Sequence, residues 1–77
     1  MDINVFVKNF ALQFDETDPE LILPDTEFKD LEEWSSLTAL SVISMVDEEY
    51  SVTLSGNDIK NSNKIADLYE IVKSKIK

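Results

Sequence analysis

Two adjacent serines, Ser35 and Ser36, have neighbours that indicate a chemical role for a hydroxyl group. Both stand where a helix is expected to begin, so the simpler interpretation of each is an N-cap that accepts hydrogen bonds from free backbone N–H groups. Leu37 and Leu40 follow, and at ~100° per residue they project from the side opposite the apolar stripe of that helix. Two leucines left in water beside a serine predict a docking surface next to a modifiable hydroxyl.

The helix that carries these residues is predicted to run from Ser36 to about Tyr50. One side has an ordinary core stripe, made of Ala39, Val42, Ile43, Val46 and Tyr50. The opposite side combines the two leucines with hydroxyls and acids, namely Leu37, Leu40, Ser41, Ser44, Asp47 and Glu48. A domain this small cannot cover both faces, so the second face is predicted to meet partner proteins.

The segment from Phe28 through Asp30, Leu31 and Ser36 to Leu37 resembles the acyl carrier protein family, in which a Phe-x-x-Asp-Leu loop leads to Asp-Ser-Leu. The resemblance runs without a gap to Tyr50 and more loosely to Val72. It implies that a phosphopantetheinyl transferase attaches 4'-phosphopantetheine from coenzyme A to Ser36, and that the helix beginning there is a recognition helix. The residues expected to contact partners are Trp34, Ser35, Leu37, Leu40, Ser41, Ser44, Asp47 and Glu48.

The resemblance implies a carrier without enzymatic activity of its own. Its arm would hold acyl intermediates as thioesters and present them to acyl-transferring and condensing enzymes with basic docking surfaces, in fatty-acid, polyketide or related secondary-metabolite biosynthesis. Ser35 stands where the family usually has aspartate, and Thr38 and Ser41 stand where fatty-acid carriers often have acids on the front of the helix. These differences favour dedicated partners, and the segment from Trp34 to Leu40 resembles specialised bacterial carriers of secondary metabolism or surface-polysaccharide pathways. Two alternatives stay open: an aminoacyl or peptidyl carrier, and an acidic helical adaptor without a prosthetic group.

Composition narrows the function further. Sixteen acids against seven lysines give a net charge of −9, which opposes binding to nucleic acid or to an anionic membrane and favours basic partners. The absence of cysteine and histidine excludes disulfides, thiolate or imidazole metal sites and a Ser-His-Asp mechanism.

Glu32 and Glu33, like Asp47 to Glu49, are expected on solvated faces. With neither a leader nor a membrane span in view, we expect a soluble, cytoplasmic monomer.

The remaining pattern predicts one all-α domain over residues 1–77, a small four-helix bundle of three longer helices and one short helix with a long first loop. The first helix is expected over about 2–14, with Ile3, Phe6, Val7, Phe10 and Phe14 inward. The loop is expected to be held by Leu21-Ile22-Leu23, Phe28 and Leu31. A short helix over about 56–61 should open with a Ser55–Asp58 capping box. Asn63 should cap the last helix, whose inward residues are Ile65, Leu68, Tyr69, Val72 and Ile76.

Overall fold

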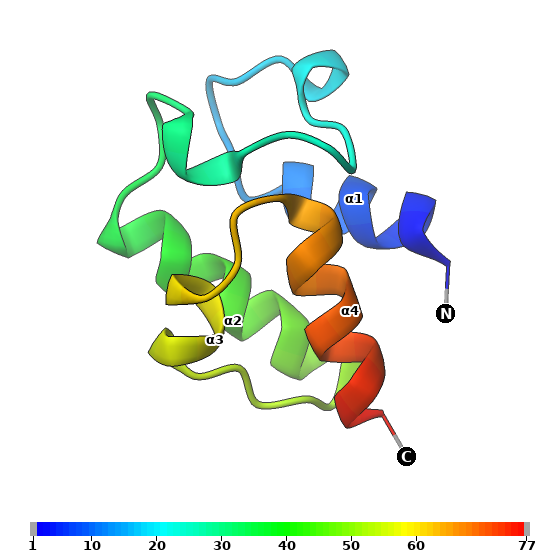
Figure 1. Ribbon diagram of the computed structural model, residues 1–77. Helices are drawn as coiled ribbons and strands as arrows, with labels where there is room; N and C mark the ends of the chain where they lie inside the picture. The colour runs from blue at the N-terminus through cyan, green and yellow to red at the C-terminus, as the bar shows by residue number, and fades with distance from the viewer. Residues whose placement is uncertain (1, 77) are drawn as a thin grey trace.

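The computed structural model describes residues 2–76, which form four α-helices joined by one long and two short connections (Figure 1). The helices are α1 (Ile3–Ala11), α2 (Ser36–Tyr50), α3 (Gly56–Lys60) and α4 (Ile65–Lys75). Two short 3-10 turns, η1 (Pro19–Leu21) and η2 (Phe28–Asp30), interrupt the long connection. The predicted all-α bundle with a long first loop is therefore confirmed. Met1 and Lys77, which the predicted domain range includes, lie outside the described residues.

Helix α1 is shorter than the periodicity predicted. Asp2 is its N-cap, and the Asp2 carboxylate accepts a hydrogen bond from the Asn4 N–H at 2.8 Å. After Ala11 the backbone tightens, because the N–H groups of Gln13 and Phe14 donate to carbonyls only three residues earlier. Phe14 still reaches the core, at 7 % exposure, but it does so from this turn rather than from the helix.

An aromatic cluster joins α1 to the long connection. The ring of Phe10 lies 5.5 Å from that of Phe14 and 5.6 Å from that of Phe28, measured between centroids. Trp34 stacks on Phe10 at 6.4 Å with an interplanar angle of 6°. Because Phe10 and Phe28 are fully buried, these contacts fasten both ends of the loop to α1.

The middle of the long connection is buried at one residue only. Ile22 is 2 % exposed, whereas Leu21 and Leu23 are 63 % and 56 % exposed. The prediction that the whole Leu21–Leu23 run packs inward was wrong for both leucines. Ile22 itself has an extended backbone, in which side chains alternate between two faces. The buried Phe28 and partly buried Leu31 hold the loop as expected.

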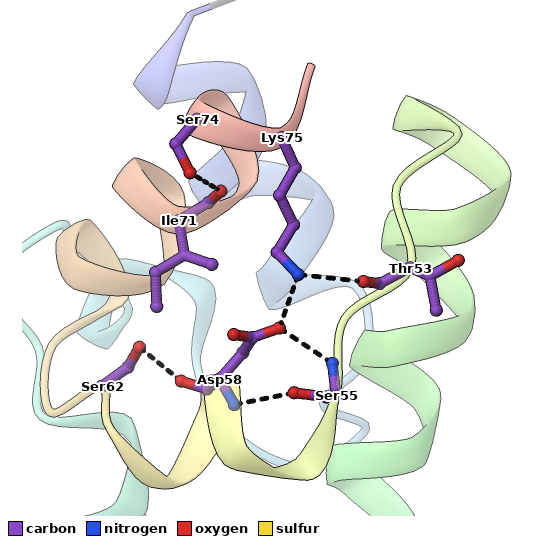
Figure 2. A network of polar contacts seen from close by, with 7 residues as sticks. All are labelled: Thr53, Ser55, Asp58, Ser62, Ile71, Ser74 and Lys75. Atoms are coloured by element: carbon purple, nitrogen blue, oxygen red, sulfur yellow. Dashed lines mark hydrogen bonds and ion pairs between the residues drawn. The ribbon is translucent and has the colours of Figure 1, made fainter. Parts of the chain in front are cut away.

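The C-terminal half is fastened by short polar contacts (Figure 2). The predicted capping box at the start of α3 is present, since Ser55 Oγ accepts from the Asp58 N–H and Asp58 accepts from the Ser55 N–H. The Lys75 ammonium lies 3.0 Å from the same carboxylate and 3.5 Å from the Thr53 carbonyl oxygen. The Ser55 N–H, together with Lys75, lowers the pKa of Asp58. The end of α4 is thereby tied to the start of α3.

Two predictions about α4 were wrong in detail. Asn63 does not cap it; instead the Asp67 carboxylate accepts from the N–H groups of Asn63 and Lys64 at 3.1 and 2.9 Å. Ile76 lies past the helix end and is 41 % exposed, while Ile65, Leu68, Tyr69 and Val72 are buried as predicted. Within residues 2–76, none of the helices has the length and apolar content that crossing a membrane requires.

Candidate functional site

The two serines at the start of α2 have different environments. Ser35 has an extended backbone and caps the helix: its hydroxyl oxygen accepts from the Thr38 N–H at 3.3 Å. Ser36 is the first residue of α2, and its exposed hydroxyl makes no hydrogen bond with any residue of the 2–76 range. The predicted capping role of Ser35 is confirmed, and Ser36 is left available for reaction.

Thr38 faces inward rather than outward. It is only 9 % exposed, and its hydroxyl donates to the Glu33 carbonyl oxygen at 2.8 Å. The expectation that Thr38 belongs to the front of the helix was therefore wrong. The physical reason is that this hydroxyl satisfies a carbonyl of the segment entering the helix. Thr38 thus holds the chain before Ser36 in a fixed path.

Glu33 is a structural clamp, which corrects the expectation that it is only solvated. Its carboxylate accepts hydrogen bonds from the Asp15 N–H at 2.6 Å, the Glu16 N–H at 2.9 Å and the Thr17 hydroxyl at 2.8 Å. The Thr17 hydroxyl contributes most to lowering the pKa of Glu33, and the two backbone N–H groups add to it. The start of the long connection is therefore tied to the segment that precedes Ser36.

Acid should release this clamp. The pKa of Glu33 in the folded protein lies below its ordinary value of 4.5, so its contribution to stability is complete above that pH and is lost as the pH falls through the folded value. We expect wild type to lose stability more steeply than Glu33→Gln between about pH 5 and pH 3. Chemical denaturation at stepped pH values measures this difference.

Amide exchange gives a local readout of the same clamp. Glu33→Gln should speed hydrogen exchange at the backbone N–H groups of Asp15 and Glu16, because both donate hydrogen bonds to the Glu33 carboxylate. Glu32→Gln is the matched control, because Glu32 is adjacent and exposed and makes no hydrogen bond within the described chain. If the stability of wild type and of Glu33→Gln depended on pH in the same way, that result would contradict the role of Glu33 as a clamp.

The other predicted partner residues of α2 lie on its outer face. Leu37 and Leu40 are 77 % and 60 % exposed, so their predicted exposure is confirmed. The remaining members of that face, which are Ser41, Ser44, Asp47 and Glu48, are exposed as well. An apolar pair thus lies directly beside Ser36, with carboxylates further along the helix.

Trp34 contributes mainly to the support of the site. Its ring is half-buried and meets the edge of Phe28 at 4.9 Å, in addition to stacking on Phe10 and Phe14. Only part of the indole can therefore meet a partner. The sequence did not indicate this role, because the contact joins a residue of the long connection to Phe10 in α1, far away along the chain.

The start of α2 suits a phosphate ester on Ser36. The first N–H groups of an α-helix have no partner within the helix, and the helix dipole favours negative charge at that end. The first turn of α2 contains no acidic side chain that would already neutralise this end. These features favour a negatively charged ester group at the Ser36 end of α2.

Comparison with known proteins agrees with this geometry. The family described as "Phosphopantetheine attachment site" matches residues 6–72, a range that includes α2, α3 and the aromatic cluster. No curated protein and no solved structure gives a match. Because the match covers most of the chain, the protein belongs to the phosphopantetheine attachment site family and has covalently attached 4'-phosphopantetheine as its prosthetic group.

Proposed function

We propose that the protein is an acyl carrier protein in which Ser36 bears the phosphopantetheine arm. Membership of the family gives it a phosphopantetheine-carrier role. The observation that supports Ser36 is the contrast with its neighbour. Ser35 is occupied as the N-cap of α2, whereas the Ser36 hydroxyl is exposed and unbonded at the positive end of a 15-residue helix.

Each residue of the site has a distinct part in this proposal. Ser36 Oγ supplies the ester oxygen, and the positive end of the helix dipole stabilises the negative charge of the phosphate. Ser35 and Thr38 fix the start of the helix, while Glu33 and Trp34 hold the segment before it. The arm supplies the thiol that a chain without cysteine lacks, and this thiol holds acyl groups as thioesters.

The proposed partners are a phosphopantetheinyl transferase and acyl-transferring or condensing enzymes with basic docking surfaces. Carrier domains of the family meet a transferase and biosynthetic enzymes in general. We assign this chain to fatty-acid, polyketide or related secondary-metabolite biosynthesis, as a single-domain cytoplasmic monomer without catalytic activity. The support for basic partners is the net charge of −9 and the outer face of α2, where Asp47 and Glu48 follow the two leucines.

Incubation with a phosphopantetheinyl transferase, magnesium and coenzyme A tests the proposal. We expect the intact mass to rise by one phosphopantetheine group per chain, and the new thiol to accept an acyl group from an acyl-transferring enzyme. A polypeptide that keeps its mass after incubation would instead favour the acidic adaptor, which has no prosthetic group.

Leu40 should serve partners more than folding. Because its side chain is 60 % exposed, Leu40→Ser should lower the free energy of unfolding by less than ~1 kcal/mol. The loss of an apolar contact on the outer face of α2 should reduce the modification rate by about tenfold. Leu23→Ser, at a leucine of similar exposure in the long connection, is the control. Destabilisation by several kcal/mol would place Leu40 in the core and remove this part of the proposal.

Salt should slow the encounter with a basic partner. The Debye length shrinks from ~10 Å at 0.1 M salt to ~3 Å at 1 M, so attraction between exposed charges is screened. We expect the association rate with the transferase to fall while the dissociation rate changes much less, because the leucine contacts are apolar. Stopped-flow binding measures both rates.

A charge reversal on α2 isolates the part of this attraction that is local. Glu48→Lys should reproduce part of the salt effect at low ionic strength, since Glu48 lies on the docking face. Glu70→Lys makes the same change in net charge at an exposed position of α4. It should have a smaller effect, because Glu70 does not lie on α2. If the two charge reversals have equal effects, the acids on the outer face of α2 act only through the net charge of the protein and not as a local docking site.

A further inference from the structure

Leu12 is an exposed leucine that the proposed function does not use. It lies directly after α1 and is 71 % exposed, close to the 77 % of Leu37. Leu12, Leu37 and Leu40 all border one groove of about 460 Å³. The end of α1 and the outer face of α2 therefore place exposed leucines around a single hollow, and one of them, Leu37, directly follows Ser36.

The wall that α1 contributes to this groove is preformed. The Asn9 side-chain amide donates to the Tyr50 hydroxyl at 3.1 Å, which links α1 to the end of α2. The Gln13 amide donates to the Asn9 carbonyl oxygen at 3.1 Å, which holds Gln13 against α1. Met45, 7 % exposed, contributes to the lining from α2. A partner would thus meet a fixed surface, so little conformational entropy is lost on binding.

The charge around the groove selects the kind of partner. Glu48 and Glu49 belong to its lining, which contains no lysine. Neither carboxylate forms an ion pair with a residue of the 2–76 range. A second copy of this chain, itself at −9, would place acid against acid. An apolar side chain flanked by lysine or arginine fits both the leucines and the carboxylates.

We propose that α1 supplies the second wall of the docking surface and that Leu12 is an anchor contact for the enzyme that modifies Ser36. That enzyme seats an apolar side chain of a basic segment between α1 and α2. The groove is bordered by Leu37, the residue after Ser36, so an enzyme acting at Ser36 Oγ is placed to reach it. This inference rests on the proposed function and deepens it by extending recognition beyond α2.

A pair of leucine substitutions tests the inference. Leu12→Ser should lower kcat/KM for modification by a phosphopantetheinyl transferase with coenzyme A by about five- to tenfold, the usual effect of removing an apolar anchor. Leu23→Ser should stay within about twofold of wild type, because Leu23 is exposed but lies outside the groove. Thermal unfolding should show that both variants remain folded.

A second pair separates this groove from a neighbouring hollow. Leu12 also borders a hollow of about 410 Å³ between α1 and the long connection, which Asn4 lines and Gln13 does not. Gln13→Lys places a cation in the proposed groove, and Asn4→Lys makes the same charge change in the other hollow. We expect Gln13→Lys to reduce kcat/KM more than Asn4→Lys does, because the partner segment is basic.

The outcomes distinguish this inference from the proposed function. If wild type is modified at Ser36 while Leu12→Ser and Gln13→Lys match their controls, the α1 wall is wrong and the carrier assignment stands. If Asn4→Lys is the more damaging cation, the second hollow is the contact and the groove is wrong. If wild type is not modified at all, the proposed function and the inference fall together.

Discussion

Phe10→Ala should leave the protein largely unfolded in the absence of stabilising cosolutes. Phe10 is fully buried and contacts the rings of Phe14, Phe28 and Trp34. Truncating a buried phenylalanine to alanine costs about 3–5 kcal/mol, through lost burial and the cavity left behind. A domain of this size has a total stability of only about 3–5 kcal/mol, so the two quantities are similar.

Urea denaturation followed by circular dichroism measures this loss. Val5→Ala is the matched control, since Val5 lies on the same helix at 51 % exposure and should change the stability by less than ~1 kcal/mol. A cooperative transition for Phe10→Ala within about 1 kcal/mol of wild type would contradict the central role of the aromatic cluster.

The aromatic cluster also connects stability to the site. Trp34 stacks on Phe10 only two residues before Ser36. The Thr38–Glu33 hydrogen bond and the Glu33 clamp act on the same short segment. The path of the chain before Ser36 therefore depends on the packing around Phe10.

Local pattern was sufficient where a residue's environment depends on its own helix. The 3.6-residue period places Val42 and Val46 in the core and Leu37 and Leu40 outside, as the structure has them. The capping box at Ser55 was also predictable, because both partners lie within one turn. Local pattern did not separate Ser35 from Ser36, because either serine could cap the helix; only the family resemblance singled out Ser36.

Contacts between distant segments could not be predicted in this way. No sequence pattern connects Glu33 with the N–H groups of residues 15 and 16. Glu33 was therefore expected on a solvated face, although its carboxylate accepts hydrogen bonds from both groups. Trp34 was expected to meet partners, but its half-buried ring packs on Phe10, Phe14 and Phe28. The proposed role of Leu12 could not be predicted for a related reason. It depends on where α1 ends and on the leucines of α2 that line the same groove.

Ser36→Ala should abolish modification altogether, because the variant has no oxygen at the position where the ester would form. Ser35→Ala should only slow it. Losing an N-cap costs about 1 kcal/mol and frays the first turn of α2, yet the Ser36 hydroxyl remains exposed. Both variants should stay folded, since neither serine belongs to the core.

Intact-mass spectrometry after incubation with a phosphopantetheinyl transferase, magnesium and coenzyme A shows whether Ser36 carries the arm. We expect wild type and Ser35→Ala to gain one phosphopantetheine group, with Ser35→Ala slower, and Ser36→Ala to keep the mass of its polypeptide. A Ser36→Ala variant that gains the group, together with a Ser35→Ala variant that does not, would place the arm on Ser35 and contradict the assignment to Ser36.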